Sequence, residues 1–246
     1  MARRLDGKVA IVTGGTRGMG EAMVRALLAE GAQVVFGGRN EDAGRRIADE
    51  LGSNALYVPQ DVAKEDDWRR IASQALDRFG RITSLVNNAG MQINSPIADM
   101  EQDALDRLYR VNQLGPLLGI KHVVPALRAA GSGSIVNIGS PAGVKGLATI
   151  TAYAGTKAAL SGITKSAAVE LAAEQIRVNI VIPGFFDTEM LAEITGGRAA
   201  RIGSAVTPMK RIAQPHEITG AILYLLSDDS LFVTGTEIRV DGGYTV

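Results

Sequence analysis

Val9-Ala10-Ile11-Val12-Thr13-Gly14-Gly15-Thr16-Arg17-Gly18-Met19-Gly20 is the stretch that decides the fold. Its first four residues are apolar and three of them are β-branched, as in a parallel strand that is covered on both faces. Glycines at 14, 18 and 20 then lead into a helix that we expect to begin near Gly20. The backbone N–H groups and the dipole of such a helix favour an anionic ligand. The stretch therefore predicts a strand, a tight turn and a helix that together bind a pyrophosphate.

The spacing of these glycines, Gly-x-x-x-Gly-x-Gly, differs from the commoner Gly-x-Gly-x-x-Gly fingerprint. Taken alone, such a turn is also compatible with a plain connection between a strand and a helix. Its place after the first strand of a predicted βαβ unit favours dinucleotide binding.

Short apolar runs recur along the chain between longer segments with helical periodicity. We expect seven strands, at residues 9–12, 34–36, 55–58, 84–87, 134–138, 177–181 and 237–240. Strands that alternate with helices indicate a parallel sheet with helices on both faces. No linker or change of composition divides the chain. The sequence predicts one doubly wound α/β Rossmann fold, with residues 1–246 as a single domain.

The composition is that of a soluble enzyme. The chain has 246 residues, 26 basic and 26 acidic side chains, and 46% hydrophobic residues, so neither a nucleic-acid partner nor a membrane span is expected. The absence of cysteine excludes disulfides and thiolate nucleophiles and is compatible with the cytoplasm, where we expect the protein to reside. His122 and His216 have no neighbour at metal-ligand spacing, so we expect no metal site.

The second strand ends in Phe36-Gly37-Gly38-Arg39-Asn40, without an acidic residue. At this place a carboxylate usually selects NAD(H) by binding a ribose hydroxyl, whereas a cation selects the 2′-phosphate of NADP(H). Arg39 could clamp that phosphate in a charge-assisted contact, with Arg17 as a second candidate. We therefore expect NADP(H) over NAD(H). The alternative, that Arg39 is a solvated loop cation, remains open.

Tyr153 and Lys157 are four residues apart, and Ser140 precedes Tyr153 by thirteen positions. On a helix, residues i and i+4 share a face, so the ammonium would stabilise the phenolate and lower the tyrosine pKa. A ketone that accepts hydride becomes an alkoxide, which requires a proton donor and a preformed hydrogen bond. Tyr153 suits the first role and Ser140 the second. Each residue alone also has an ordinary structural explanation; together they favour hydride transfer.

The chain as a whole resembles the classical short-chain dehydrogenase/reductase family, from Lys8 to the Val-Asp-Gly-Gly segment at 240–243. The matching motifs are Thr-Gly-x-x-x-Gly-x-Gly at 13–20, Asp-Val at 61–62, Asn-Asn-Ala-Gly at 87–90, Asn112, Ser140, Tyr153, Lys157, and Pro-Gly at 183–184 with Thr188.

The resemblance implies that Asn112, Ser140, Tyr153 and Lys157 are catalytic. It gives Asn112 a backbone carbonyl that anchors a water beside the lysine, and it lets Lys157 reach the nicotinamide ribose. With the residues derived above, the expected cofactor site comprises Gly14, Thr16, Arg17, Gly18, Met19, Gly20, Arg39, Asp61, Val62, Asn88, Ala89, Gly90, Tyr153, Lys157, Pro183, Gly184, Phe186 and Thr188.

The segment after Pro183-Gly184 is expected to bind the substrate. It is apolar, with Phe185, Met190 and Leu191, and it contains glycines at 196 and 197. We expect a substrate lid at about 185–212 over a hydrophobic ketone or secondary alcohol, with a cyclic or aryl compound favoured. An ordinary amphipathic helix packed on the core is the alternative explanation of this segment.

Three further functions stay open. A 3-oxoacyl-(acyl-carrier-protein) reductase typically docks its acidic carrier through arginines before the fifth and sixth strands, but this chain has Ser134 and Glu174 there. The lid and tail resemble bacterial hydroxysteroid and carbonyl reductases, which often use NAD(H) with an aspartate near position 38; here that position is Gly38. A non-catalytic dinucleotide-binding regulator is the most remote of the three.

Family members are usually tetramers that assemble through two long helices and the C-terminal strand. The apolar stretch Ile218 to Leu226 and the C-terminal residues 242–246 are compatible with this arrangement. The resemblance therefore implies a homotetramer.

Overall fold

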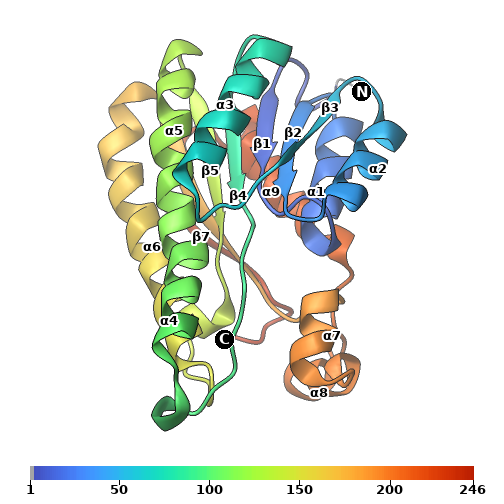
Figure 1. Cartoon of the computed structure of the whole chain (residues 1–246), viewed down its shortest axis with the longest axis vertical. Coiled ribbons are helices and arrows are strands. Elements are labelled where there is room, and N and C mark those ends of the chain that lie inside the picture. Colours follow the sequence, from blue (N-terminus) through green and yellow to red (C-terminus); the bar gives the residue numbers. More distant parts are fainter. Residues whose placement is uncertain (1–2) are drawn as a thin grey trace.

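The computed structural model describes residues 3–246, which form a seven-stranded parallel sheet between two layers of helices (Figure 1). The strand order is β3-β2-β1-β4-β5-β6-β7, and every neighbouring pair is parallel. The strands are β1 (Val9–Val12), β2 (Gln33–Gly38), β3 (Ala55–Pro59), β4 (Ser84–Asn87), β5 (Gly133–Ile138), β6 (Ile176–Pro183) and β7 (Glu237–Val240). The prediction of a doubly wound Rossmann fold with seven parallel strands is confirmed.

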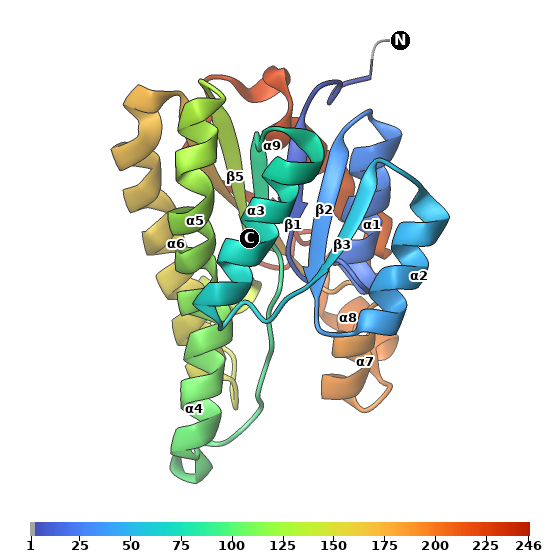
Figure 2. The same cartoon turned by 45° about the horizontal axis from the view of Figure 1, so that its top comes forward.

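Helices cover both faces of the sheet, as Figures 1 and 2 show. They are α1 (Gly18–Ala29), α2 (Glu41–Leu51), α3 (Glu65–Phe79), α4 (Gln102–Tyr109), α5 (Gly115–Ala129), α6 (Thr151–Leu171), α7 (Glu189–Thr195), α8 (Ala199–Val206) and α9 (Thr219–Leu226). The helices α1, α2 and α9 pack on one face, where Phe36 and Tyr57 are buried. The opposite face carries α3, α5 and α6 around Trp68.

Alternating side chains of the buried strands supply both cores. In β1, Ala10 and Val12 join the core under α1, whereas Ile11 joins the core under α3 and α5. A strand that is buried on both faces is expected to be apolar at successive positions, which is why β1 is recognisable as a continuous apolar run.

The strand order reverses between β1 and β4, because β2 and β3 lie on one side of β1 and β4 to β7 on the other. In open α/β sheets, such a switch point leaves a crevice at the carboxyl ends of the strands, where ligands bind. The helices α7 and α8 lie beside this end of the sheet, apart from the two main layers (Figure 1).

Two local features differ from the expectation. The first helix begins at Gly18, two residues earlier than expected, directly inside the glycine-rich turn. The apolar stretch Ile218 to Leu226 is largely interior: Ile218, Ile222 and Leu225 are at most 1% exposed and belong to the core beside α1. These three side chains are therefore unavailable for subunit contacts.

Within residues 3–246, no helix combines the length and the hydropathy needed to cross a bilayer. The same residues contain no group of three or more histidine, aspartate or glutamate side chains arranged to hold a metal ion.

Candidate active site

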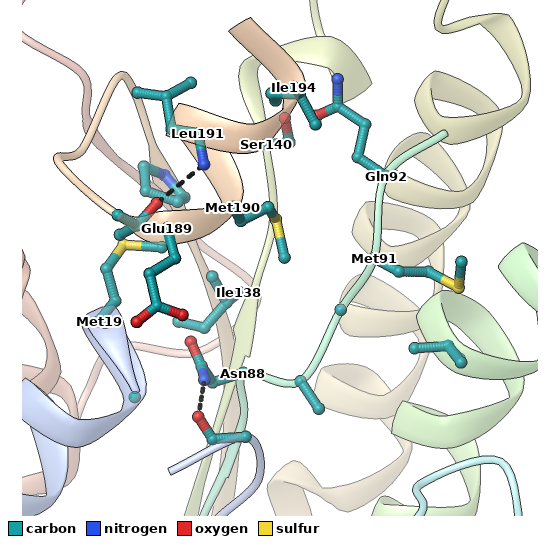
Figure 3. Close-up of a pocket in the computed structure, with 18 of the residues that line it drawn as sticks. Met19, Asn88, Met91, Gln92, Ile138, Ser140, Glu189, Met190, Leu191 and Ile194 are labelled. Atoms are coloured by element: carbon teal, nitrogen blue, oxygen red, sulfur yellow. Dashed lines mark hydrogen bonds between the residues drawn. The ribbon is translucent and has the colours of Figure 1, made fainter. Parts of the chain in front are cut away.

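A cleft of about 1460 Å³ opens at the carboxyl edge of the sheet. Every residue of the expected cofactor site lines it, together with Ser140, whereas Asn112 lies behind its wall. Figure 3 shows part of this cleft, with Met19 at the left, Asn88 at the bottom, Met91 and Gln92 at the right, and Met190 and Ile194 of α7 in the upper part. The sequence motifs, which are far apart along the chain, therefore converge on one space.

The glycine-rich turn is held against the end of β4. Asn88 Nδ2 donates to the carbonyls of Thr13 and Gly14, at 2.9 and 3.1 Å. The Thr13 hydroxyl accepts from the backbone N–H groups of Asn88 and Ala89. Gly14 and Gly18 adopt φ of 65° and 55°, in the left-handed region that glycine tolerates best. The turn is thus fixed in a shape that other residues would strain.

The helix α1 begins in this turn, and its N-cap residue Arg17 makes no capping hydrogen bond with its side chain. The first N–H groups of a helix have no partner within the helix. With Gly18 and Met19 lining the cleft, these donors and the helix dipole suit a pyrophosphate.

The side chain of Arg17 is paired with α7 across the cleft. Its guanidinium binds Glu189 of α7 at 2.8 Å, and Glu193 lies 3.8 Å away. From the sequence, Arg17 was a candidate phosphate ligand and Glu189, which lies 172 positions later in the chain, was not singled out. No local pattern could have revealed this pair.

At the end of β2, Arg39 is exposed, lines the cleft and forms no ion pair among residues 3–246. Arg46 of α2 lines the same part of the cleft and was not singled out from the sequence. A Cβ atom at Gly38 would lie 2.7 Å from Thr16 Cγ2, so a larger residue at this position would require the Thr16 side chain to move. The end of β2 therefore offers cations and no carboxylate.

Tyr153 and Lys157 lie on the first turns of α6, and both are buried, at 9% and 5% exposure. Lys157 Nζ lies 5.8 Å from the centre of the Tyr153 ring and donates to the carbonyl of Ile138 at 2.8 Å. Ser140 begins the short helical turn Pro141–Gly143, and its hydroxyl accepts from Ala142 N at 3.2 Å. The expected phenol, ammonium and hydroxyl thus meet at one end of the cleft.

Burial is the main cause of the pKa shifts of Tyr153 and Lys157. It raises the pKa of the Tyr153 phenol above its usual value of 10.0, and the nearby Ser140 hydroxyl opposes this only in part. This is opposite to the lowering that we expected from Lys157, because removal from water penalises the phenolate more strongly. Burial also lowers the pKa of Lys157 to about 8. Tyr153 is therefore protonated near neutrality, as a proton donor must be.

Asn112 acts from behind the cleft. It lies in a π-helical turn, Arg110–Leu114, that joins α4 to α5, and it is 1% exposed. Its amide accepts from Met91 N at 2.9 Å and donates to Met91 O at 2.8 Å. A further bond, at 3.3 Å, reaches Thr156 of α6. The side chain therefore fixes the loop after β4 relative to the helix that carries Tyr153.

Many apolar side chains line the cleft around α7, beside polar ones such as Gln92 and Arg198. Thr188 caps α7 by accepting from Leu191 N at 3.3 Å, and this places the apolar face of α7 over the cleft. Tyr244, near the C-terminus, adds an aromatic wall that packs edge-on against Phe185 with ring centres 5.1 Å apart. Tyr244 was not predicted as a site residue from the sequence. The apolar lining here includes Met91, Leu147, Ile150, Phe185, Met190, Leu191, Ile194, Ile202 and Tyr244.

Comparison with known proteins identifies the family. Residues 14–245 match a family model described as enoyl-(acyl carrier protein) reductase. The chain is 42% identical to a 3-alpha-(or 20-beta)-hydroxysteroid dehydrogenase of Mycobacterium tuberculosis, over 99% of this chain and 91% of the relative. It is 37% identical to an NADP-dependent (R)-specific alcohol dehydrogenase of Lentilactobacillus kefiri, over 100% and 99%.

A third relative is the cyclopentanol dehydrogenase of a Comamonas strain, 38% identical over 98% of both chains. Among solved structures, a short-chain type dehydrogenase/reductase from Mycobacterium marinum superposes with a TM-score of 0.93 at 34% identity, covering 99% of this chain and 98% of the other. The sequence motifs, the sheet order and these matches agree: the chain belongs to the short-chain dehydrogenase/reductase family and is an oxidoreductase that acts on CH–OH groups.

Proposed function

We propose that this enzyme transfers hydride between NADP(H) and a hydrophobic ketone or secondary alcohol. The observation that carries the proposal is the meeting of Tyr153, Ser140 and Lys157 at the apolar end of a cleft. At the other end of that cleft lie the N-terminus of α1 and the guanidinium of Arg39, which suit the phosphates of the cofactor.

Bound NADPH supplies the hydride, and the residues of this chain manage the charge that develops on the substrate oxygen. Tyr153 donates a proton to that oxygen, since burial keeps the phenol protonated near neutrality. Ser140 holds the same oxygen by a hydrogen bond that strengthens as negative charge develops. Lys157 supplies a cation beside the phenol, and Asn112 holds Met91 and α6 in position.

The preference for NADP(H) rests on the end of β2. Arg39 and Arg46 line this part of the cleft, and Gly38 cannot carry an acidic side chain without meeting Thr16. A 2′-phosphate is attracted to guanidinium groups and repelled by carboxylates. The Lentilactobacillus relative is NADP-dependent by name, which agrees with this preference.

Calorimetry with NADPH and NADH on the wild type and on Arg39→Ala tests the preference. We expect NADPH to bind at least about tenfold more tightly, equivalent to ~1.4 kcal/mol, and Arg39→Ala to remove most of the difference. Arg45→Ala is the matched control. Arg45 forms an ion pair with Glu41 and does not line the cleft, so its removal should not alter the preference. Tighter NADH binding by the wild type would reassign the protein to NAD-dependent dehydrogenases.

The substrate is proposed to be a cyclic or aryl ketone, or the corresponding alcohol. The apolar lining includes two flexible methionines, Met91 and Met190, and the ring of Tyr244, so the cleft suits rigid hydrophobic rings. The relatives named for hydroxysteroids and for cyclopentanol have substrates that contain rings, as their names say. A panel of cyclic, aryl and linear ketones with NADPH should show the highest kcat/KM for the ring compounds.

A 3-oxoacyl-(acyl-carrier-protein) reductase is the competing function within the same family. Ser134 is 3% exposed and donates to the carbonyl of Leu225, whereas Glu174 is paired with Arg128. Neither position presents a cation to an acidic carrier. Turnover of 3-oxoacyl thioesters without turnover of simple ketones would favour the carrier-protein function.

Two further candidate functions remain, an NAD-dependent hydroxysteroid dehydrogenase and a non-catalytic regulator. The cofactor calorimetry and the substrate panels described above distinguish both from the proposed function. The hydroxysteroid dehydrogenase would bind NADH more tightly than NADPH and oxidise steroid alcohols. The regulator would bind the dinucleotide without turning over any ketone or thioester of the panels.

We further infer that residues 1–246 act as one domain, with residues 185–212 as the substrate lid, in a cytoplasmic homotetramer. Exposed apolar side chains support the assembly: Val169 of α6 is 83% exposed, Leu117 of α5 is 39% exposed and Phe232 is fully exposed. Light scattering should give four times the chain mass of 25.8 kDa, and the mass of a monomer would reject the tetramer.

A further inference from the structure

Lys145 lies in the turn that follows Ser140, and its ammonium group contacts the C-terminal segment. Its Nζ donates to the carbonyl of Tyr244 at 3.2 Å and lies 4.3 Å from the centre of the Tyr244 ring. The two residues are 99 positions apart in the chain. A cation over an aromatic face and a charge-assisted hydrogen bond both stabilise this arrangement. One side chain thus holds Tyr244 by its backbone and by its ring.

The turn that carries Lys145 is itself fixed to the helix that carries the catalytic residues. Lys145 N donates to the carbonyl of Pro141 at 2.9 Å, and Pro141 starts the short helical turn that follows Ser140. Gly143 packs directly on α6, because a Cβ atom there would lie 2.9 Å from the backbone carbonyl carbon of Lys157. Lys145 is therefore anchored, within a few residues, to the backbone that positions the catalytic serine and lysine.

The C-terminal segment forms a compact turn around Asp241. The Asp241 carboxylate accepts from the backbone N–H groups of Gly243 and Thr245, at 2.9 and 3.0 Å, and from the Thr245 hydroxyl at 2.5 Å. Gly243 has a φ of 83°, in the left-handed region that glycine tolerates best. This turn returns Tyr244 to the cleft, where only 9% of the residue is exposed.

Two side chains hold the Tyr244 ring in the cleft wall. Phe185 meets it edge-on, with ring centres 5.1 Å apart, and the Lys145 ammonium lies over it. Phe185 and Tyr244 both line the cleft, whereas Lys145 does not. Lys145 therefore acts on a substrate only through the aromatic wall that it holds.

We propose that Lys145 is a positioning residue that fixes the Tyr244 ring relative to the Ser140 turn and thereby favours rigid ring ketones as substrates. The proposal rests on the ketone-reducing function given above. A rigid ring packs well only on a wall that is already in place, because ordering the wall during binding costs conformational entropy. An open-chain ketone can adjust its torsions to a looser wall and depends on it less.

Steady-state kinetics of Lys145→Ala with NADPH tests this role on cyclohexanone and on 2-hexanone, its open-chain counterpart. We expect KM for cyclohexanone to rise about three- to tenfold, the scale of a lost cation–π contact and hydrogen bond. The kcat value and KM for 2-hexanone should each change by less than about twofold, because Tyr153 and Ser140 are untouched. Lys145→Arg should restore the wild-type KM, since a guanidinium also donates hydrogen bonds and stacks on aromatic rings.

A double-mutant cycle with Tyr244→Leu shows whether Lys145 acts through the ring. In the Tyr244→Leu background, Lys145→Ala should change KM for cyclohexanone by less than about twofold, because the effects of coupled residues are not additive. Lys165→Ala is the matched control and should alter neither KM. Lys165 is also exposed, forms an ion pair with Glu237, and like that residue does not line the cleft.

The thermal midpoint separates this role from an effect on folding. Lys145 is exposed, so the midpoint of Lys145→Ala should stay within about 4 °C of the wild type, and a change in KM could then not be ascribed to unfolding. If Lys145→Ala does not fold, Lys145→Gln takes its place in the same comparisons.

Four results would overturn the proposal. If both KM values stay at the wild-type level, Lys145 is only a surface charge. If they rise by the same factor, or if the rise persists in the Tyr244→Leu background, Lys145 acts by another route. If the wild type reduces linear ketones but no ring ketone, the preference for rings fails while hydride transfer stands. If the wild type reduces no ketone at all, the proposed function itself fails, which is distinguishable because the other three results require turnover.

Discussion

The Arg17 guanidinium lies 2.8 Å from the Glu189 carboxylate and joins the glycine-rich turn to α7, which is part of the proposed lid. Glu189 therefore places a negative charge in the cleft where a polyanionic cofactor is proposed to bind, and occupies a cation that could contact it. Figure 3 shows the carboxylate directed into the cleft near Met19 and Asn88. Under this proposal, Glu189 and the bound cofactor would compete for Arg17.

Neutralisation of Glu189 should strengthen cofactor binding. Glu189→Gln removes a carboxylate from the cleft and frees Arg17, so we expect NADPH to bind about two- to fivefold more tightly, the scale of an exposed ion pair. Calorimetry at low and high salt measures the change, which screening should reduce. Glu193→Gln, at the longer distance of 3.8 Å, should have a smaller effect. Weaker binding by Glu189→Gln would show that the lid contact supports the bound state instead.

Gly38→Asp should impair the binding of NADPH more than that of NADH. Its Cβ would crowd Thr16, and its carboxylate would repel a 2′-phosphate. Gly38→Ser introduces the same crowding without the charge. We expect titrations to show a loss of about tenfold or more in the ratio of NADPH to NADH affinity for the aspartate variant only. Equal losses in both variants would reduce the effect to steric crowding.

Lys157 should destabilise the folded protein at neutral pH. Its pKa falls from 10.5 to about 8 on burial, so between these values the unfolded chain binds more protons and stability rises with pH. Below pH 8 the penalty is fully present. Lys157→Met should therefore unfold with a free energy roughly 2 to 4 kcal/mol higher at pH 7, and this gain should shrink toward pH 10.5. Chemical denaturation at both pH values measures it. A gain that does not change with pH would contradict burial of the charge.

Asn112→Leu should reduce kcat more than it changes KM. The substitution leaves the N–H and carbonyl groups of Met91 without their partner, which should cost about 1–3 kcal/mol of stability and misplace the loop beside Tyr153. Steady-state kinetics at a temperature where the variant stays folded separates the two effects. Gln113→Leu, the adjacent substitution that retains both Met91 bonds, is the control. An unchanged kcat would limit Asn112 to a structural role.

Much of this architecture could be predicted because its signals are local. The strand β1 is buried on both faces and is an uninterrupted apolar run, and β6 is fully buried and apolar apart from Arg177 and Asn179. The cofactor turn and the Tyr153-Lys157 pair also occupy short segments of sequence. Such motifs converge because the carboxyl ends of parallel strands meet at one edge of the sheet.

The features that escaped prediction depend on tertiary contacts. The bond between Arg17 and Glu189 joins two exposed charges across the cleft, and Tyr244 reaches the site only through the return of the C-terminal segment against Phe185. The predicted lowering of the Tyr153 pKa was wrong. The spacing of Lys157 is visible in the sequence, but the burial of the phenol, which raises its pKa, is not.

The most direct test of the proposed chemistry is NADPH-dependent reduction of a cyclic ketone by the wild type, Tyr153→Phe and Tyr244→Phe. Both variants lose one cleft hydroxyl and keep the ring, but only Tyr153 is proposed to donate the proton. We expect Tyr153→Phe to lose about 100- to 10,000-fold in kcat while binding NADPH as the wild type does, and Tyr244→Phe to remain within about threefold. Full activity of Tyr153→Phe would contradict the central claim.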